Sequence, residues 1–307
     1  MASTAPTRQT RLATVLLVLV TAIWGSTFFL IRDLLEHVPT TDFLSVRFSI
    51  AAVVMLLVFR RQTLALRSRD LRLGLALGAV YGVAQVLQTT GLETTDASVS
   101  GFITGTYVVL TPVLAAVILR ERIGPPTWAA VALATLGLAI LSLRGLSIGT
   151  GEAVTLASAV LYAAHIVALG RWSTPQTAVG LAAVQATAIA IITSAAALPD
   201  GLILPQGSTQ WASLLYMAIV AGAAALWAQT WAQAHLTATR AAIVMALEPV
   251  FAALFAVALG GESLTGRMLF GGALVVAAMY LVELAPRAGS GANALEDPPA
   301  EALHHDV

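Results

Sequence analysis

Polar side chains recur at helical spacing inside several long apolar stretches of this chain. Residues at positions i, i+4, i+7 and i+11 lie on one face of a helix. Amides and phenols supply both hydrogen-bond donors and acceptors without burying a charge, so stripes of them predict a polar site. Each Ser or Thr could instead join two helices by a hydrogen bond of about 0.6 kcal/mol. The stripes are Tyr81, Gln85 and Gln88; Ser100, Thr104, Tyr107 and Thr111; Ser158, Tyr162 and His165; Gly222, Gln229 and Gln233.

Ionisable side chains also lie inside apolar stretches, where an unpaired charge is costly. Glu248 precedes Pro249, which removes a backbone N–H and frees a carbonyl one turn earlier. We predict that Glu248 is a coupling residue that exchanges a proton during a conformational cycle; the alternative is a capping or interhelical hydrogen bond. Arg47, Pro112 and Pro249 are predicted to be structural, with Arg47 pairing with helix-end carbonyls. An unperturbed imidazole titrates near neutral pH, and His165 either faces a solute or packs through a hydrogen bond.

The composition indicates that the apolar stretches cross a lipid bilayer. Apolar residues make up 58% of the 307 residues and charged residues 10%, whereas soluble domains contain about 25% charged residues. A spanning helix needs about 20 apolar residues, and continuous runs of that length do not fit the alternating pattern of a membrane barrel. We predict an all-α integral membrane protein with ten transmembrane helices, at 12–31, 41–59, 71–91, 98–119, 125–143, 152–170, 177–197, 210–233, 240–259 and 265–284.

The arginines predict how these helices are oriented. If the N-terminus is cytoplasmic, twelve arginines fall in inner segments and three in outer loops, which is a strong positive-inside bias. The inner set is Arg8, Arg11, Arg60, Arg61, Arg67, Arg69, Arg72, Arg120, Arg122, Arg171, Arg240 and Arg287, and the outer set is Arg32, Arg144 and Arg267. We therefore expect a multi-pass protein of the cell (plasma) membrane with both termini in the cytoplasm: a short segment at 1–11 and a disordered polar tail at 285–307. The first span could instead be a signal peptide, but its apolar run is long and no small-x-small site follows it.

Internal repeats divide the ten expected spans into two units. Leu110-Thr111-Pro112-Val113 recurs as Leu247-Glu248-Pro249-Val250, an offset of 137 residues between the two prolines. Trp24 corresponds to Tyr162, and Gln85 to Gln229, at similar offsets. We predict one five-helix repeat at 12–143 and a second at 152–284. Because each repeat has an odd number of helices, the second would enter the membrane upside down, as in alternating-access transporters whose solute site lies between the repeats.

Four segments are typical of one family of carriers: Ala22-Ile23-Trp24-Gly25-Ser26, Arg47-Phe48, Gln229-Thr230-Trp231-Ala232-Gln233 and, most specifically, the run from Arg240 through Glu248-Pro249 to Leu254. Through these segments the chain resembles the EamA-type branch of the drug/metabolite transporter superfamily. The resemblance covers roughly residues 12–284 and implies a ten-helix carrier with a central cavity between its halves, usually an exporter of amino acids or other small metabolites.

Together these patterns predict a secondary-active transporter that exports small metabolites, amino acids or drugs; the alternative is a membrane-embedded sensor or assembly protein without transport activity. The enzyme signatures HExxH and GxxxxGK[ST] are absent from the sequence. The expected partners are a small-molecule substrate, the lipid bilayer and protons, with no nucleic acid, metal or cofactor. The predicted solute-binding residues are Trp24, Gln85, Gln88, Tyr107, Tyr162, His165, Gln229 and Gln233, while Trp227 and Trp231 are expected to face lipid.

Overall fold

Helices are the only regular elements in the part of the chain that the structure describes, as the apolar runs predict. The structure is a computed structural model that describes residues 8–95, 97–120, 123–142, 149–197, 201–259 and 264–284. The predicted tail at 285–307 lies outside these ranges, as do residues 1–7 of the expected N-terminal segment. The all-α class is therefore confirmed for the described residues.

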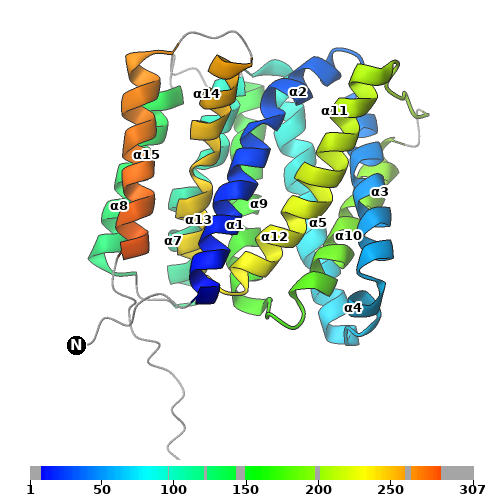
Figure 1. Ribbon diagram of the computed structural model, residues 1–307, viewed down its shortest axis with the longest axis horizontal. Coiled ribbons are helices and arrows are strands. Elements are labelled where there is room, and N and C mark those ends of the chain that lie inside the picture. Colours follow the sequence, from blue (N-terminus) through cyan, green and yellow to red (C-terminus); the bar gives the residue numbers. More distant parts are fainter. Residues whose placement is uncertain are drawn as a thin grey trace, which may run out of the picture.

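The helices form one elongated bundle, in which those of the first half of the chain are interleaved with those of the second half (Figure 1). The first half contains α1 (Arg8–Gly25), α2 (Thr27–Leu35), α3 (Thr40–Val58), α4 (Arg60–Leu64), α5 (Ser68–Thr94), α6 (Ala97–Gly105), α7 (Tyr107–Ile118) and α8 (Pro125–Ser142). The second contains α9 (Thr150–Trp172), α10 (Ala178–Ala197), α11 (Ser208–Ala218), the π-helical segment η2 (Ile219–Ala224), α12 (Ala225–Gln233), α13 (Ala238–Met245), α14 (Glu248–Ala258) and α15 (Gly266–Leu284).

Six helical stretches are long and apolar enough to cross a membrane: Thr40–Val58, Ser68–Thr94, Thr150–Trp172, Ala178–Ala197, Ser208–Gln233 and Ala238–Phe255. Each coincides with one of the expected spans. Shorter apolar helices occupy Ile103–Ile118, Pro125–Ile140 and Leu269–Leu281, and α1 and α2 occupy the first expected span. Length and composition thus support six of the ten spans, and the count of ten stays a prediction.

Large apolar side chains cover much of the outer surface of the bundle. Leu57 on α3 and Val117 on α7 are each 73% exposed, and Leu254, Leu269 and Phe270 on α14 and α15 are also exposed. A surface of this kind favours association or aggregation in water, whereas in a bilayer the hydrocarbon chains cover it without cost. The multi-pass membrane assignment therefore agrees with the packing as well as with the composition.

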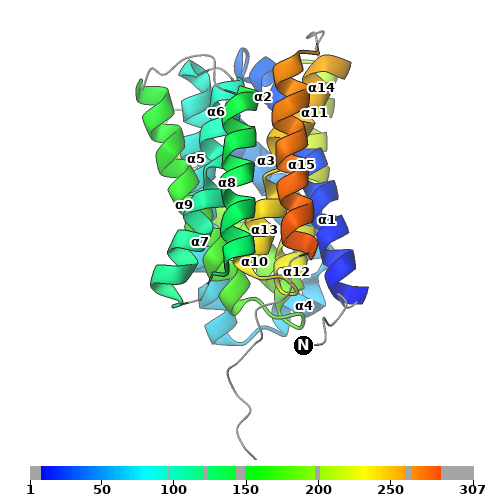
Figure 2. The ribbon, with the colours of Figure 1, turned by 90° about the vertical axis from the view of Figure 1, so that its left-hand side faces the viewer.

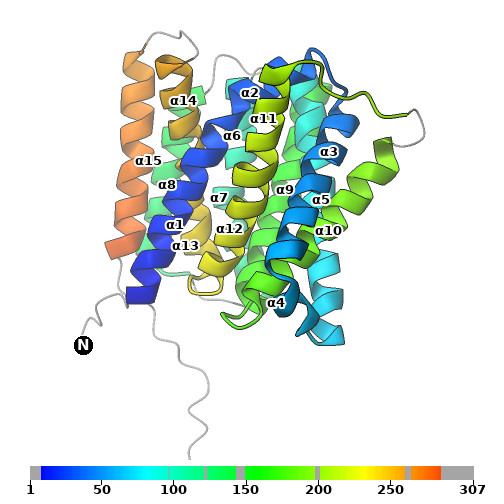
Figure 3. The same cartoon turned by 45° about the vertical axis from the view of Figure 1, so that its right-hand side comes forward.

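Most helix pairs join one half of the chain to the other. The most extensive contacts are between α8 and α15, α5 and α9, α3 and α10, and α5 and α10, followed by α1 with α12 and α7 with α9. Figure 2 shows α8 beside α15, and Figure 3 shows α3 beside α10. We equate α1 with α9, α3 with α10, α5 with α11–α12, α7 with α13–α14 and α8 with α15. Exchanging the halves then converts each of these pairs into a pair that is also in contact: α5–α10 becomes α3 with α11 and η2, and α7–α9 becomes α1 with α13 and α14. The packing therefore has the two-fold relation that a duplicated unit predicts.

Several expected spans are interrupted near the middle of the bundle. The ninth expected span breaks between α13 and α14, directly before Glu248 and Pro249, because Pro249 lacks an N–H and its ring displaces the carbonyl four residues earlier. The first breaks at Ser26, the fourth at Thr106, and the eighth contains η2. The break at Pro249 was predictable from the sequence, and it places a carboxyl group at the first position of a new helix.

Candidate functional site

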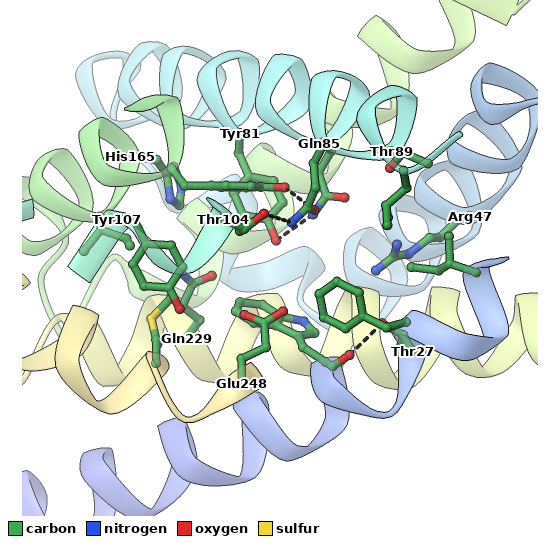
Figure 4. A pocket seen from close by; sticks show the side chains of 18 residues that line it. Thr27, Arg47, Tyr81, Gln85, Thr89, Thr104, Tyr107, His165, Gln229 and Glu248 are labelled. Atoms are coloured by element: carbon green, nitrogen blue, oxygen red, sulfur yellow. Dashed lines mark hydrogen bonds between the residues drawn. The ribbon is translucent and has the colours of Figure 1, made fainter. Parts of the chain in front are cut away.

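A cavity lies between the two halves of the chain (Figure 4). The empty space in the cavity and its open mouth together is about 640 Å³. Its wall is formed by α1, α2, α3, α5, α6 and α7 from the first half and by α9, α12, α13 and α14 from the second. Both repeats therefore contribute to a single hollow, and the interrupted helices α1–α2, α6–α7 and α13–α14 all border it.

The cavity brings together seven of the eight predicted solute-binding residues, namely Trp24, Gln85, Gln88, Tyr107, Tyr162, His165 and Gln229. Gln233 does not line it: this side chain is buried one helical turn beyond Gln229, and its Nε2 donates to the carbonyl oxygen of Ile166 at 3.4 Å. Glu248 and Arg47 line the same cavity. Residues from all four polar stripes thus line the same cavity. That these side chains bind a solute stays a prediction.

Sequence reasoning missed a wall formed by the end of the first span. Thr27, Phe28 and Ile31 line the cavity together with Trp24, and their spacing of three, four and seven residues places them on the same helical face. Two of the three are apolar, so a search for polar stripes passes over them. The remaining lining residues outside the predicted set are Tyr81, Thr89, Leu92, Thr104, Ile166 and Met245.

A hydrogen-bonded network joins the two halves on one side of the cavity. The hydroxyl of Tyr162 on α9 donates to Oε1 of Gln88 on α5 at 2.9 Å, and Nε2 of Gln88 donates to Oγ1 of Thr104 on α6 at 3.0 Å. Nε2 of Gln85 donates to the hydroxyl of Tyr81 at 3.1 Å, and the rings of Tyr81 and Tyr162 pack edge to face with centroids 5.4 Å apart. These groups are oriented before any solute enters.

His165 is held by a buried amide. Its Nε2 lies 2.7 Å from Oε1 of Gln185, while Nε2 of Gln185 donates to the carbonyl oxygen of Leu181 at 3.3 Å. Because a carbonyl oxygen can only accept, the amide must present its oxygen to His165, so Nε2 of the ring carries a proton. In the neutral ring Nδ1 is then a hydrogen-bond acceptor, and it is buried with no hydrogen-bond partner among the described residues.

Two further polar atoms at the same end of the cavity are unsatisfied. The hydroxyl of Tyr107 and Oε1 of Gln229 are buried without a hydrogen-bond partner in the described part of the chain, and Figure 4 shows both side chains near His165. An unsatisfied buried polar group costs about 1–3 kcal/mol. A polar solute or water that bonds to these atoms would recover that free energy.

Glu248 stands where α1 and α14 approach most closely. A Cβ atom added to Gly25 would lie 2.9 Å from the carbonyl oxygen of Glu248, 2.8 Å from the nitrogen of Ala252 and 2.7 Å from Cβ of Phe251. Only glycine permits this approach, which brings Trp24 and Glu248 to one wall of the cavity. The carboxyl group is half-buried and forms no ion pair with the described residues.

Arg47 and Trp24 both bond to backbone carbonyls in or beside η2. Nε of Arg47 donates to the carbonyl oxygen of Met217 at 3.2 Å, and Nε1 of Trp24 donates to that of Ala221 at 3.0 Å. Met217 is the penultimate residue of α11, directly before η2, in a helical stretch that continues to Gln233. The structural role expected for Arg47 stays a prediction. The guanidinium also lies 5.0 Å from the ring centroid of Phe48 and 5.7 Å from that of Phe43.

Comparison with known proteins agrees with this architecture. A protein of Archaeoglobus fulgidus named as an uncharacterized transporter is 32% identical over 87% of this chain and 84% of its own length. A Salmonella typhimurium protein named as a probable amino-acid metabolite efflux pump is 28% identical over 87% of this chain and 93% of its own. One crystal structure, 17% identical in sequence, covers 90% of this chain and 97% of its own with a TM-score of 0.74, which supports the fold.

The family comparison also finds the duplication. The EamA-like transporter family matches residues 11–143 and, a second time, residues 149–284. These ranges agree closely with the repeats inferred from the recurring Leu-x-Pro-Val segments, and together they cover most of the chain. The chain belongs to the EamA-like transporter family.

Proposed function

We propose that this protein is a secondary-active transporter that exports small metabolites, amino acids or drugs by alternating access. The observation that carries the proposal is the cavity between the halves. Both repeats line it, and several of its polar atoms have no hydrogen-bond partner among the described residues. A site at the interface of two repeats can open to either side of the membrane as the repeats rock against each other. The name of the Salmonella relative supports amino-acid metabolites as the first solutes to test.

The arrangement of the halves supports ten spans in two inverted repeats with cytoplasmic termini. α1 begins at the end of the bundle where α4 lies, whereas α9 begins at the opposite end (Figure 2). Equivalent helices therefore run in opposite directions. The arginine-bearing helix α4 lies at the end where α1 starts and α15 finishes (Figure 1), which is the end that the arginine distribution assigns to the cytoplasm.

Proton coupling through Glu248 is part of the same proposal. A carboxyl group inside the membrane is costly in its charged form unless it is paired, and Glu248 has no cationic partner among the described residues. Binding or release of a proton there would change the charge of the cavity wall at the α13–α14 break. An ion gradient could in this way drive the change between the two open states.

The test compares metabolite efflux from cells with and without this chain, followed by flux measurements with the purified protein in proteoliposomes. We expect at least one amino-acid metabolite to leave the cells faster when the protein is present, and to cross the liposome membrane only when the protein is incorporated. Absence of flux for every metabolite detected in the cells would count against transport and favour the sensor or assembly alternative.

A further inference from the structure

We infer that Arg47 binds an anionic group of the solute, so that the cavity selects solutes that bear a carboxylate or a phosphate. This inference rests on the proposed transport function. Arg47 is only 4% exposed and lines the cavity. Its contacts within the described residues are one backbone carbonyl and two phenylalanine rings, and none of these is a counter-charge.

The charge of Arg47 has no anionic partner among the described residues. Removing a guanidinium from water costs several kcal/mol unless an anion or several hydrogen bonds replace the lost hydration. A neutral carbonyl and two aromatic rings offset part of this cost. The other ionisable cavity residue, Glu248, forms no ion pair with Arg47, and Figure 4 shows the two side chains on different parts of the wall. An anionic group on the solute would complete the pairing.

The hydrogen bonds of the guanidinium leave one edge available. Its Nε–H is already directed at the carbonyl oxygen of Met217. The pair of Nη groups makes no hydrogen bond to the described residues, and these two nitrogens form a fork that matches two oxygens of a carboxylate or phosphate. Since the Nε side is occupied, a bidentate anion must approach end-on, which fixes its orientation in the cavity.

The π-helical segment positions this fork. Trp24 and Arg47 come from two different helices and bond to carbonyls of Ala221 and Met217, respectively. Gly222 directly follows Ala221 in the sequence, and a Cβ there would lie 3.0 Å from the Met217 oxygen and 3.4 Å from Cβ of Ala51 on α3. Isolated π turns within α-helices occur frequently at functional sites. Here the π turn orients the carbonyl oxygen that holds the guanidinium of Arg47 at the cavity wall.

The opposite end of the cavity has different chemistry. Figure 4 shows Arg47 near Thr89 at one end and His165, Tyr107 and Gln229 at the other. Three atoms at the second end have no hydrogen-bond partner among the described residues: two acceptors, on His165 and Gln229, and one hydroxyl, on Tyr107. The inferred solute therefore has an anionic group at the Arg47 end and a hydrogen-bond donor at some distance from it.

The test uses the full-length protein in lipid nanodiscs and measures binding of matched probes by tryptophan fluorescence. L-Phenylalanine and L-phenylalaninamide differ only in the carboxylate, and phenyl phosphate tests the phosphate alternative. We expect wild-type protein to bind one of the two probes that carry an anionic group at least about tenfold more tightly than the amide, since hydrogen bonds between charged groups are stronger than those to a neutral group. Arg47→Gln should remove this preference, and Arg47→Lys should restore part of it. Arg171→Gln, which removes an exposed arginine on α9, should leave it unchanged.

A second variant tests the positioning role of η2 without removing the charge. Gly222→Ala should weaken anion binding several-fold and leave binding of the amide unchanged, whereas Gly101→Ala, at a site where nothing lies within 4 Å, should change neither. The inference is overturned if no probe binds, if wild-type protein binds anions and the amide equally, or if Arg47→Gln keeps the preference. Efflux from cells that continues undiminished with Arg47→Gln would overturn it too and leave transport standing, whereas wild-type protein without efflux would count against transport itself.

Discussion

Two glutamines at equivalent positions of the repeats have different surroundings. Gln85 on α5 donates to the hydroxyl of Tyr81, whereas Oε1 of Gln229 on α12 is buried without a partner in the described part of the chain. An amide already in use contributes less new hydrogen bonding to a solute than an amide with a free acceptor. The duplication thus supplied the same residue type twice, and later divergence gave the two copies different surroundings.

Replacement of either glutamine by alanine should weaken solute affinity. We expect Gln229→Ala to lower affinity about five- to tenfold, corresponding to about 1 kcal/mol for a lost hydrogen bond, and Gln85→Ala to have a smaller effect. Binding of the transported metabolite to purified protein measures this. Trp227→Ala and Trp231→Ala serve as controls, because neither residue lines the cavity. If only the tryptophan variants lost binding, the solute pathway would lie on the other face of α12.

Glu248→Gln should abolish the pH dependence of transport and lower its rate, because the amide keeps the shape of the side chain and cannot exchange a proton. The titratable and charged side chains that share the cavity with Glu248 are Arg47, Tyr81, Tyr107, Tyr162 and His165. The helices packed against α14, which are α1, α2, α6, α8 and α15, add none to the cavity. Flux into proteoliposomes at several pH values measures the effect.

Glu36→Gln, at an exposed position just after α2, is the matched control for this change of charge and should behave as wild type. A Glu248→Gln protein with the wild-type rate and the wild-type pH profile would show that the carboxyl group is structural. Loss of pH dependence in His165→Gln, with Glu248→Gln unaffected, would assign the proton to the imidazole instead.

The residues of the site were predictable to the extent that they form polar stripes. Spacing on one helical face was enough to bring Gln85, Tyr107 and Tyr162 into one cavity. It could not separate Gln229 from Gln233, because residues four apart share a face and only the depth of the cavity distinguishes them. Apolar lining such as Phe28 carries no sequence signal of its own, since an apolar residue in a membrane span is as compatible with lipid as with a cavity.

At the scale of helices, two interruptions have different causes: the break before α14 follows from the local sequence, whereas the π-helical segment η2 depends on contacts with distant helices. Pro249 dictates the break before α14 chemically. No proline accounts for η2, which lies in a run of alanine, valine, isoleucine and glycine. Within η2, the carbonyl oxygen of Ala221 accepts a hydrogen bond from Trp24, and just before η2 the carbonyl oxygen of Met217 accepts one from Arg47. Such partners become visible only when distant helices are assembled, so the π turn could not be inferred from local sequence.

The contact between α1 and α14 should be sensitive to a single methyl group. Gly25→Ala would place Cβ within 3.0 Å of two backbone atoms of α14, and a backbone can relieve such an overlap only by moving the helix. We expect a loss of about 1–3 kcal/mol in stability, as for other overpacked contacts, seen as a lower thermal unfolding temperature in detergent and reduced solute affinity. Gly266→Ala, with open space around it, is the control. Unchanged stability of Gly25→Ala would mean that the helices are less closely packed than the structure shows.

At the scale of the whole molecule, the two halves do not form separate cores. The principal helix pairs α3–α10, α5–α9, α8–α15 and α1–α12 each take one member from either half. Internal repeats in the sequence predicted the duplication and its offset, but could not show that the copies interlock instead of packing side by side. Interlocking also explains why the cavity is lined by both halves, since helices of the first copy and of the second border it.

The orientation of the molecule gives a prediction that tests the repeats and the arginine distribution together. The chain contains no cysteine, so single cysteines can be introduced without removing native ones. Ser68 begins α5 and Ser208 begins α11, both are exposed, and these helix starts lie at opposite ends of the bundle (Figure 3). A membrane-impermeant thiol reagent added to intact cells should label Ser208→Cys and not Ser68→Cys. After permeabilisation both should react, which controls for accessibility of the thiol at position 68.

Two outcomes would contradict this prediction. Because positive charge favours the cytoplasmic side, labelling of position 68 alone in intact cells would invert the assigned orientation. Equal labelling of both positions would mean that α5 and α11 run in the same direction, which would contradict the inverted repeats.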